Sequence, residues 1–235
     1  MSNDVFILKA SLRSPVMTDK PIHIDGLLLA MREDRDGPDS VGTPFDALAK
    51  TDGVFHASAG FFVGSGLTPV VETKHVTIKR LQTNGGGDED WFRNDGRYIP
   101  KMSPHRPTVT QNPTIEGAVA ILWQCRGNAD KALMLARRIF CVGGRRNNGY
   151  GRVERWDVLP CSASSDKAGW FGQGGEVLRN LPRSFISGRH PPGSMPDIGR
   201  VEPSYGGAEG RIEIVKPTLT AMLGSSMTAR AILAF

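Results

Sequence analysis

The sequence is poor in aromatic residues and cysteine and has no long apolar run, and the last two of these shortages each argue against a class of protein. Aromatic residues make up only 7% of the chain. No segment approaches the roughly 20 consecutive apolar residues of a membrane-spanning helix. The 3 cysteines, at positions 125, 141 and 161, form no CxxC pair and are odd in number, which argues against a zinc site or a disulfide framework. Residues 1–13 do not resemble a signal peptide. We therefore expect a cytoplasmic protein with reduced thiols and no membrane contact.

Glycine and proline are plentiful, at 28 and 16 of 235 residues, and they predict many turns rather than a helical bundle. Hydrophobic residues make up 39% of the chain, which is enough for a folded core. The formal net charge is +5, and it is unevenly distributed. Six arginines and a single acid, Glu154, lie between Arg137 and Arg155. This local excess of positive charge predicts contact with a polyanion.

The hydrophobic pattern predicts an α+β protein with a ferredoxin-like βαββαβ core over residues 1–159. Two helices are expected, one at 26–34 capped by Asp25 and one at 129–140 capped by Asn128. A long irregular insertion is expected at about 82–113. Residues 160–235 are expected to form a lobe rich in glycine and proline, in which only 211–216 is strand-like. The strands predicted in the core are 5–13, 55–66, 70–81, 115–125 and 152–159.

The most distinctive segment is a glycine- and arginine-rich loop between the second helix and the last strand. Glycines permit positive φ angles, paired arginines bind phosphate, and asparagine and tyrosine can contact bases. The alternative is a plain helix–strand connection in which Asn-Gly only makes the turn. The candidate RNA-binding residues are Gly143, Gly144, Arg145, Arg146, Asn147, Asn148, Gly149, Tyr150, Gly151 and Arg152.

The position of this loop argues against a nucleotide-binding enzyme. A P-loop or a Rossmann loop follows a strand and opens a helix, whereas this loop follows a helix and opens a strand. The chain also has no GxxxxGK[ST] sequence. We therefore expect no nucleotide cofactor.

Two segments resemble the RAMP superfamily of CRISPR RNA-binding proteins. They are LRSPVMTDKPIHIDGLLLAM near the N-terminus and GGRRNNGYGRVERWDV around the loop. The resemblance is to the type IV effector subunit that caps the 5′ handle of the CRISPR RNA (crRNA). It implies a non-catalytic RNA-binding subunit without a cofactor, which contacts the backbone and large subunits of the complex. The resemblance leaves open whether the subunit also contacts target DNA near its flanking motif.

The insertion at 82–113 carries aromatic and basic residues that suit a nucleic-acid-binding thumb. Its alternative is a disordered loop that starts with the acidic residues 88–90. The candidate thumb residues are Trp91, Arg93, Arg97, Tyr98, Lys101 and Arg106.

Two other functions remain open on the sequence. Related RAMP proteins that mature crRNA are metal-independent ribonucleases. His23, with Lys20 or Arg13 near it in the sequence, is the best-placed general base for such chemistry. A packing or capping role for His23 is the simpler interpretation, so no catalytic residue is expected. The other possibility is a stand-alone RNA-binding module outside any CRISPR system. No metal site is expected.

Overall fold

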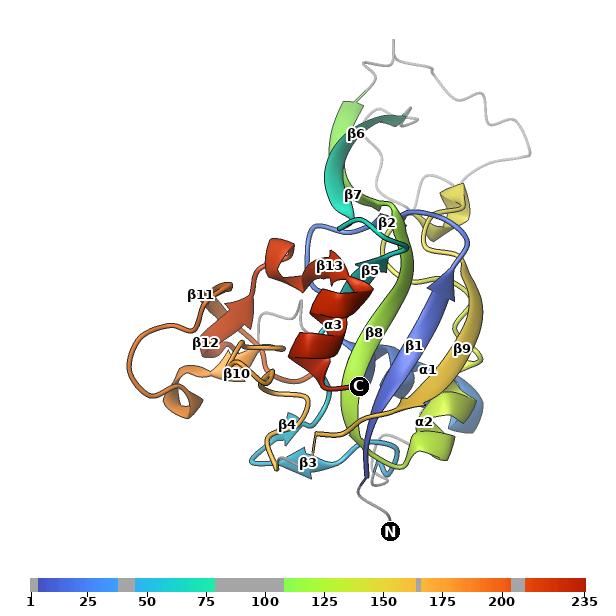
Figure 1. The fold of residues 1–235 in the computed structure, drawn as a ribbon. Coiled ribbons are helices and arrows are strands. Elements are labelled where there is room, and N and C mark those ends of the chain that lie inside the picture. The colour runs from blue at the N-terminus through green and yellow to red at the C-terminus, as the bar shows by residue number, and fades with distance from the viewer. Residues whose placement is uncertain (1–3, 38–44, 79–107, 164–165, 204–209) are drawn as a thin grey trace, which may run out of the picture.

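The computed structural model describes residues 4–37, 45–78, 108–163, 166–203 and 210–235 (Figure 1). The chain is an α+β protein built on a five-stranded sheet. Neighbouring strands are antiparallel, except that the short C-terminal strand runs parallel to its neighbour. In spatial order the strands are β13 (Leu223–Ser225), β5 (Phe61–Gly64), β8 (Ala118–Gly127), β1 (Asp4–Leu12) and β9 (Val153–Pro160).

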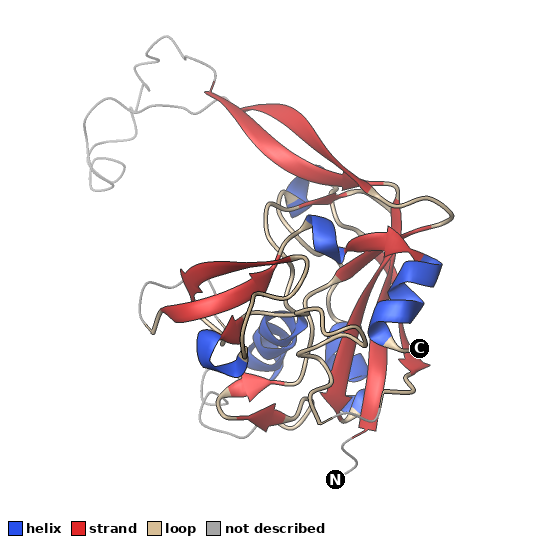
Figure 2. Ribbon diagram, turned by 60° about the vertical axis from the view of Figure 1, so that its left-hand side comes forward, coloured by secondary structure: helices blue, strands red, loops and turns tan. Residues whose placement is uncertain are grey.

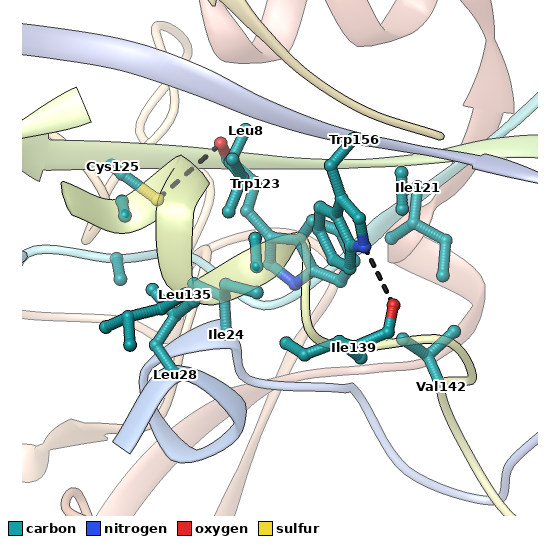
Figure 3. Close-up of a cluster of buried hydrophobic side chains, with 14 of the residues drawn as sticks. Leu8, Ile24, Leu28, Ile121, Trp123, Cys125, Leu135, Ile139, Val142 and Trp156 are labelled. Carbon is teal, nitrogen blue, oxygen red and sulfur yellow. Dashed lines mark hydrogen bonds between the residues drawn. The ribbon is translucent and has the colours of Figure 1, made fainter. Parts of the chain in front are cut away.

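Two helices, α1 (Ile24–Asp36) and α2 (Ala129–Ala136), cover one face of this sheet. The buried face of α2 consists of Ala132, Leu135 and Ala136. The predicted cap is confirmed, because the Asn128 side chain accepts from the N–H of Lys131 at 3.0 Å. At the centre of the core, Trp123 stacks on Trp156 with ring centroids 5.5 Å apart (Figure 3). In β1, the apolar side chains of Phe6, Leu8 and Ala10 lie on the face of the sheet that packs against the helices. The alternating pattern of this strand indicates that face, because every second side chain of a strand points the same way.

Both helix boundaries differ from the prediction. Asp25 is not the cap of α1, because the N-cap position is His23 and Asp25 lies in the first turn. The second helix ends at Ala136 rather than at residue 140. Beyond it the chain turns, so that Ile139 still reaches the core while Phe140 faces outward.

The other face of the sheet is covered by the C-terminal part of the chain. Helix α3 (Ser226–Leu233) lies over β5 and β8, and its Leu233 packs in a second cluster with Ile7, Leu122 and Leu178. Neither α3 nor β13 was predicted. The sequence does contain a signal for the start of α3, because serine is a common helix-capping residue. Ser225 caps α3 by accepting from the N–H of Thr228 at 3.3 Å.

A two-stranded hairpin projects away from the sheet (Figure 2). It consists of β6 (Val70–Ile78) and β7 (Thr108–Glu116), and β2 (Val16–Met17) pairs with its root. The predicted irregular insertion is therefore wrong at its C-terminal end, because residues 108–113 belong to β7. The β-branched residues 108–110 favour a strand. Farther along β7, the carbonyl of Pro113 accepts from the N–H of Thr18 at 2.9 Å.

Two small sheets and three short 3-10 turns complete the described residues. One cluster, with Trp170, Leu181 and Val215, forms a third apolar core beneath the three-stranded sheet. The strand predicted at 211–216 is confirmed, and it corresponds to β12 (Ile212–Pro217). No helix in the described ranges is long and apolar enough to cross a membrane. The remaining strands are β3 (Lys50–Thr51), β4 (Val54–Phe55), β10 (Leu181–Pro182), β11 (Ser194–Gly199) and β12 (Ile212–Pro217).

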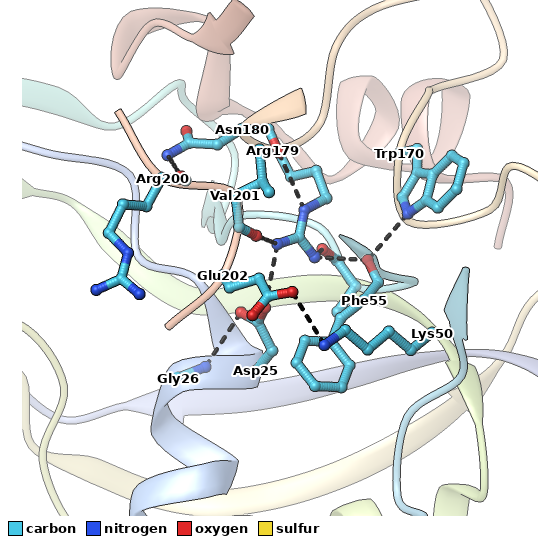
Figure 4. A network of polar contacts seen from close by, with 11 residues as sticks. Asp25, Gly26, Lys50, Phe55, Trp170, Arg179, Asn180, Arg200, Val201 and Glu202 are labelled. Atoms are coloured by element: carbon cyan, nitrogen blue, oxygen red, sulfur yellow. Dashed lines mark hydrogen bonds and ion pairs between the residues drawn. The ribbon is translucent and has the colours of Figure 1, made fainter. Parts of the chain in front are cut away.

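The fully buried side chain of Arg179 connects helix α1 with residues 55–57 and with the C-terminal third of the chain (Figure 4). One terminal nitrogen of Arg179 donates to the carbonyls of Phe55 at 2.5 Å and Ala57 at 3.0 Å. The other donates to Asp25 at 3.1 Å and to the Val201 carbonyl at 2.7 Å. The Asp25–Arg179 pair has no exposed side-chain surface at either partner. A buried charge is tolerated only with such partners, so this network ties α1 to the C-terminal third of the chain.

Replacing Arg179 should therefore strongly destabilise the fold. We expect Arg179→Met to lower the free energy of unfolding by about 3–5 kcal/mol, because the Asp25 carboxylate would stay buried without its cation. Urea denaturation measures the loss. The control is Arg183→Met, which removes a partly exposed arginine that donates to the carbonyls of Ile186 and Gly188, and which should cost about 1 kcal/mol. Equal losses in the two variants would contradict the role given to Arg179.

Candidate functional site

The candidate site is the segment 143–152, here called the arginine loop, which joins α2 to β9. Its stem is a pair of antiparallel segments, in which the N–H of Val142 donates to Gly151 and the N–H of Val153 donates to Phe140, each at 2.9 Å. The loop also binds the segment that follows β1. The N–H of Gly144 donates to the Met17 carbonyl at 2.7 Å, and that of Gly151 to the Pro15 carbonyl at 2.8 Å. The loop is thus held from two sides.

Two of the glycines serve close packing of backbones. Gly151 has a φ of 65°, and a Cβ atom there would lie 1.8 Å from the Val142 carbonyl oxygen. Gly143 has a φ of 81°, and its Cβ would lie 2.8 Å from the Met17 carbonyl oxygen. Such positions accept only glycine. The sequence suggested that these glycines let a ligand approach, whereas the neighbour that approaches is the chain itself.

Several backbone N–H groups of the loop are engaged within the protein. Besides Gly144 and Gly151, the N–H of Asn148 donates to Arg145 at 2.9 Å and that of Gly149 to Arg146 at 3.0 Å, within a 3-10 turn. An anion-binding cradle of backbone amides needs N–H groups that face a ligand. The N–H groups that bind within the protein therefore cannot contribute to such a cradle.

The side chains of the loop stand at its rim. Arg146, Asn147, Asn148 and Arg152 are exposed, and Arg145 and Tyr150 are half-buried. Arg145 has a φ of 53°, a left-handed conformation that costs a non-glycine residue roughly 1–2 kcal/mol. Such strain persists only where the surroundings hold the backbone in place. The loop therefore presents its side chains from a fixed backbone.

The six arginines of the segment differ in how their charge is balanced. Arg138 pairs with Asp34 at 2.9 Å and Arg155 with Asp157 at 2.9 Å. Glu154 is occupied by Arg13 at 3.2 Å. Within the part of the chain that the structure describes, no carboxylate pairs with Arg137, Arg146 or Arg152. The excess positive charge expected from the sequence thus remains at the rim of the loop and at the base of its stem.

A surface hollow of about 320 Å³ separates the loop from the root of the hairpin. We call it the loop hollow. On one side it is lined by Gly143, Gly144 and Arg145, and on the other by Met17, Thr18, Asp19, Asn112 and Pro113. The fold therefore places the arginine loop next to the strands that lead into the insertion. The candidate thumb residues Trp91, Arg93, Arg97, Tyr98, Lys101 and Arg106 lie outside the described residues.

His23 is buried at the start of α1, with 9% of its surface exposed. Burial, and next the cation of Arg179, lower the pKa of His23 from 6.5 to about 4. The ring is therefore neutral at pH 7. Arg13, suggested as its partner, is bonded to Glu154 at the surface. The other described buried histidine, His56, stacks on Trp170 at 4.3 Å and contacts Thr51 and the Ala168 carbonyl.

In the described ranges, no three side chains of His, Cys, Asp or Glu come together as metal ligands would. No protein-family model matches the sequence, and no curated protein matches it significantly. The site must therefore be interpreted from its own chemistry.

The buried His23 should make the fold sensitive to acid. The unfolded chain takes up a proton at His23 near pH 6.5, and the folded chain only near pH 4. Stability is therefore unaffected above pH 6.5 and falls as the pH drops toward 4, by about 3 kcal/mol in total from this group. In His23→Gln this part of the pH dependence should vanish, as measured by urea denaturation between pH 7.5 and 4. The control His190→Gln, at an exposed histidine, should follow the wild type. Parallel profiles of His23→Gln and wild type would show that His23 is not buried as described.

Proposed function

We propose that this chain is a non-catalytic RNA-binding subunit of a type IV CRISPR effector complex that grips the 5′ repeat-derived handle of the crRNA through the arginine loop. The observation that carries the proposal is the group of arginines without carboxylate partners in the described chain, displayed on a fixed loop. Guanidinium groups bind phosphate through paired hydrogen bonds, and a polyanion is the ligand that satisfies several of them at once.

The arrangement of the sheet supports the proposal. Strands β5, β8, β1 and β9 are neighbours in this order, and β1 is antiparallel to both β8 and β9. Helices follow β1 and β8 in the sequence. This is the order expected of a ferredoxin-like βαββαβ core, which the resemblance to RAMP proteins implies. In this interpretation the hairpin is an elaboration between the second and third core strands, and α3 with β13 is a C-terminal addition.

The chemistry of the loop suits single-stranded RNA. The side chains of Arg145, Arg146 and Arg152 would hold the phosphates. The side-chain amides of Asn147 and Asn148 are exposed and suit hydrogen bonds to base edges and 2′-hydroxyls. The loop hollow gives the bound strand a path toward the hairpin, where the candidate thumb would complete the grip.

In the complex this subunit would contact the backbone and large subunits and lie near the flanking motif of target DNA. These partners follow from the resemblance alone. The burial and low pKa of His23 favour a structural role for this residue over general base catalysis, because a base needs access to the 2′-hydroxyl and a pKa nearer the working pH. The processing endoribonuclease is therefore the less favoured function.

The proposal predicts a change in the salt dependence of RNA binding. Each lost phosphate contact should lower the slope of log K against log salt concentration by roughly 0.7 for a single strand. We expect Arg145→Ala/Arg146→Ala to weaken binding of a fluorescein-labelled single-stranded 20-nucleotide RNA and to lower this slope by about 1.4. Fluorescence anisotropy at several salt concentrations measures both.

The matched control is Arg35→Ala/Arg138→Ala. It removes the same charge from two arginines that are already paired, with Asp36 and Asp34, on the helical side of the molecule. This variant should keep nearly the wild-type slope. Equal slopes for all three proteins would contradict phosphate binding by the arginine loop.

A further inference from the structure

A second surface hollow, also of about 320 Å³, lies at the outer edge of β9. We call it the edge hollow. It is lined by Phe140 and Val153 from the stem of the arginine loop, by Trp156 from β9, and by the arginines 137 and 155. Val153 and Phe140 are joined by a hydrogen bond of the stem. The stem of the arginine loop therefore also forms one wall of the edge hollow.

Phe140 is unusual in this hollow because 76% of it is exposed. Its neighbour Ile139 is buried, and the extended chain alternates, so the Phe140 ring points outward. The backbone on both sides is fixed. The indole nitrogen of Trp156 donates to the Ile139 carbonyl at 2.9 Å (Figure 3), and the N–H of Val153 donates to the Phe140 carbonyl at 2.9 Å. The backbone that carries the ring is therefore fixed in the absence of a ligand, which lowers the entropy cost of binding to the ring.

The charges around the ring favour an anion. The two acids that line the edge hollow are both engaged, Asp157 by Arg155 at 2.9 Å and Glu154 by Arg13 at 3.2 Å. Arg137 lines the same hollow, and no described carboxylate pairs with it. An exposed aromatic face beside an unneutralised guanidinium is the combination that single-strand nucleic-acid-binding surfaces use, with the ring for a base and the cation for a phosphate.

We propose that the edge hollow binds one unpaired nucleotide of single-stranded RNA, with its base stacked on Phe140 and its phosphate held by Arg137. The inference rests on the proposed function and extends it, because it continues the RNA from the rim of the arginine loop to the edge of β9. The volume of the hollow lies at the lower end of the range for small-ligand sites, which suits a single nucleotide rather than a helix or strand of a partner protein.

The test compares two 12-nucleotide RNAs with equal phosphate number, one of mixed sequence and one with abasic residues throughout. Stacking requires the bases, whereas phosphate contacts do not. We expect Phe140→Ala to weaken binding of the mixed-sequence RNA roughly tenfold and that of the abasic RNA less than twofold. Phe140→Trp should retain wild-type affinity, because the indole also offers a face for stacking. Leu67→Ala, at another side chain that is 85% exposed, should change neither affinity.

The outcomes separate this inference from the function on which it rests. If Phe140→Ala binds both RNAs as the wild type does while Arg145→Ala/Arg146→Ala is weakened, the stacking site is overturned and the proposed function stands. If Phe140→Ala weakens binding of both RNAs equally, the Phe140 ring does not stack on a base and the inference fails. If Phe140→Ala loses only the mixed-sequence RNA while the loop variant binds normally, the edge hollow is upheld and the role of the loop is overturned. Failure of the wild type to bind either RNA would overturn both.

Discussion

The buried guanidinium of Arg179 is the constraint on which the arrangement of the molecule depends. It binds the carbonyls of Phe55, Ala57 and Val201 together with Asp25, which lie far apart in the sequence. A charge this deeply buried must keep its partners, so the first turn of α1 and the C-terminal third of the chain cannot separate without a large cost. The start of α1 in turn limits where the segment after β1 can run, and that segment supports the arginine loop through Pro15 and Met17.

In the arginine loop, the backbone and the side chains have different roles. Its amides and its two tightly packed glycines hold the loop against residues 15–17, and its arginines and asparagines face outward. A loop whose backbone is held by several internal hydrogen bonds presents its side chains at little further backbone entropy cost on binding. One hollow lies between the loop and the root of the hairpin, and another lies at the edge of β9 beside the loop stem. This layout gives an RNA strand a continuous surface in our proposal.

The features of the fold that depend on residues close together in the sequence were predicted well. The alternation in β1, the presence of β9, the Asn128 cap and the apolar stripe of α2 were all readable, because each depends on nearby residues. The composition of the arginine loop singled out the candidate site, and its role in binding stays a prediction. The burial of Arg179 had no such signal, since an isolated arginine in the sequence does not reveal its partners. The use of the loop glycines depends on Pro15 and Met17, which lie more than a hundred residues away in the sequence. The exposed position of Phe140 was missed because helical periodicity was extended past Ala136.

The most direct test of the central claim is to map where RNA touches the protein. The protein would be cross-linked by ultraviolet light to single-stranded RNA that contains 4-thiouridine, digested with chymotrypsin, and analysed by mass spectrometry. Our account predicts that cross-linked peptides come from residues 137–155, and that they disappear in the presence of excess unlabelled RNA. Cross-links that fall instead on the helices α1 and α2 or on the small sheet of β10, β11 and β12, with none in 137–155, would contradict it.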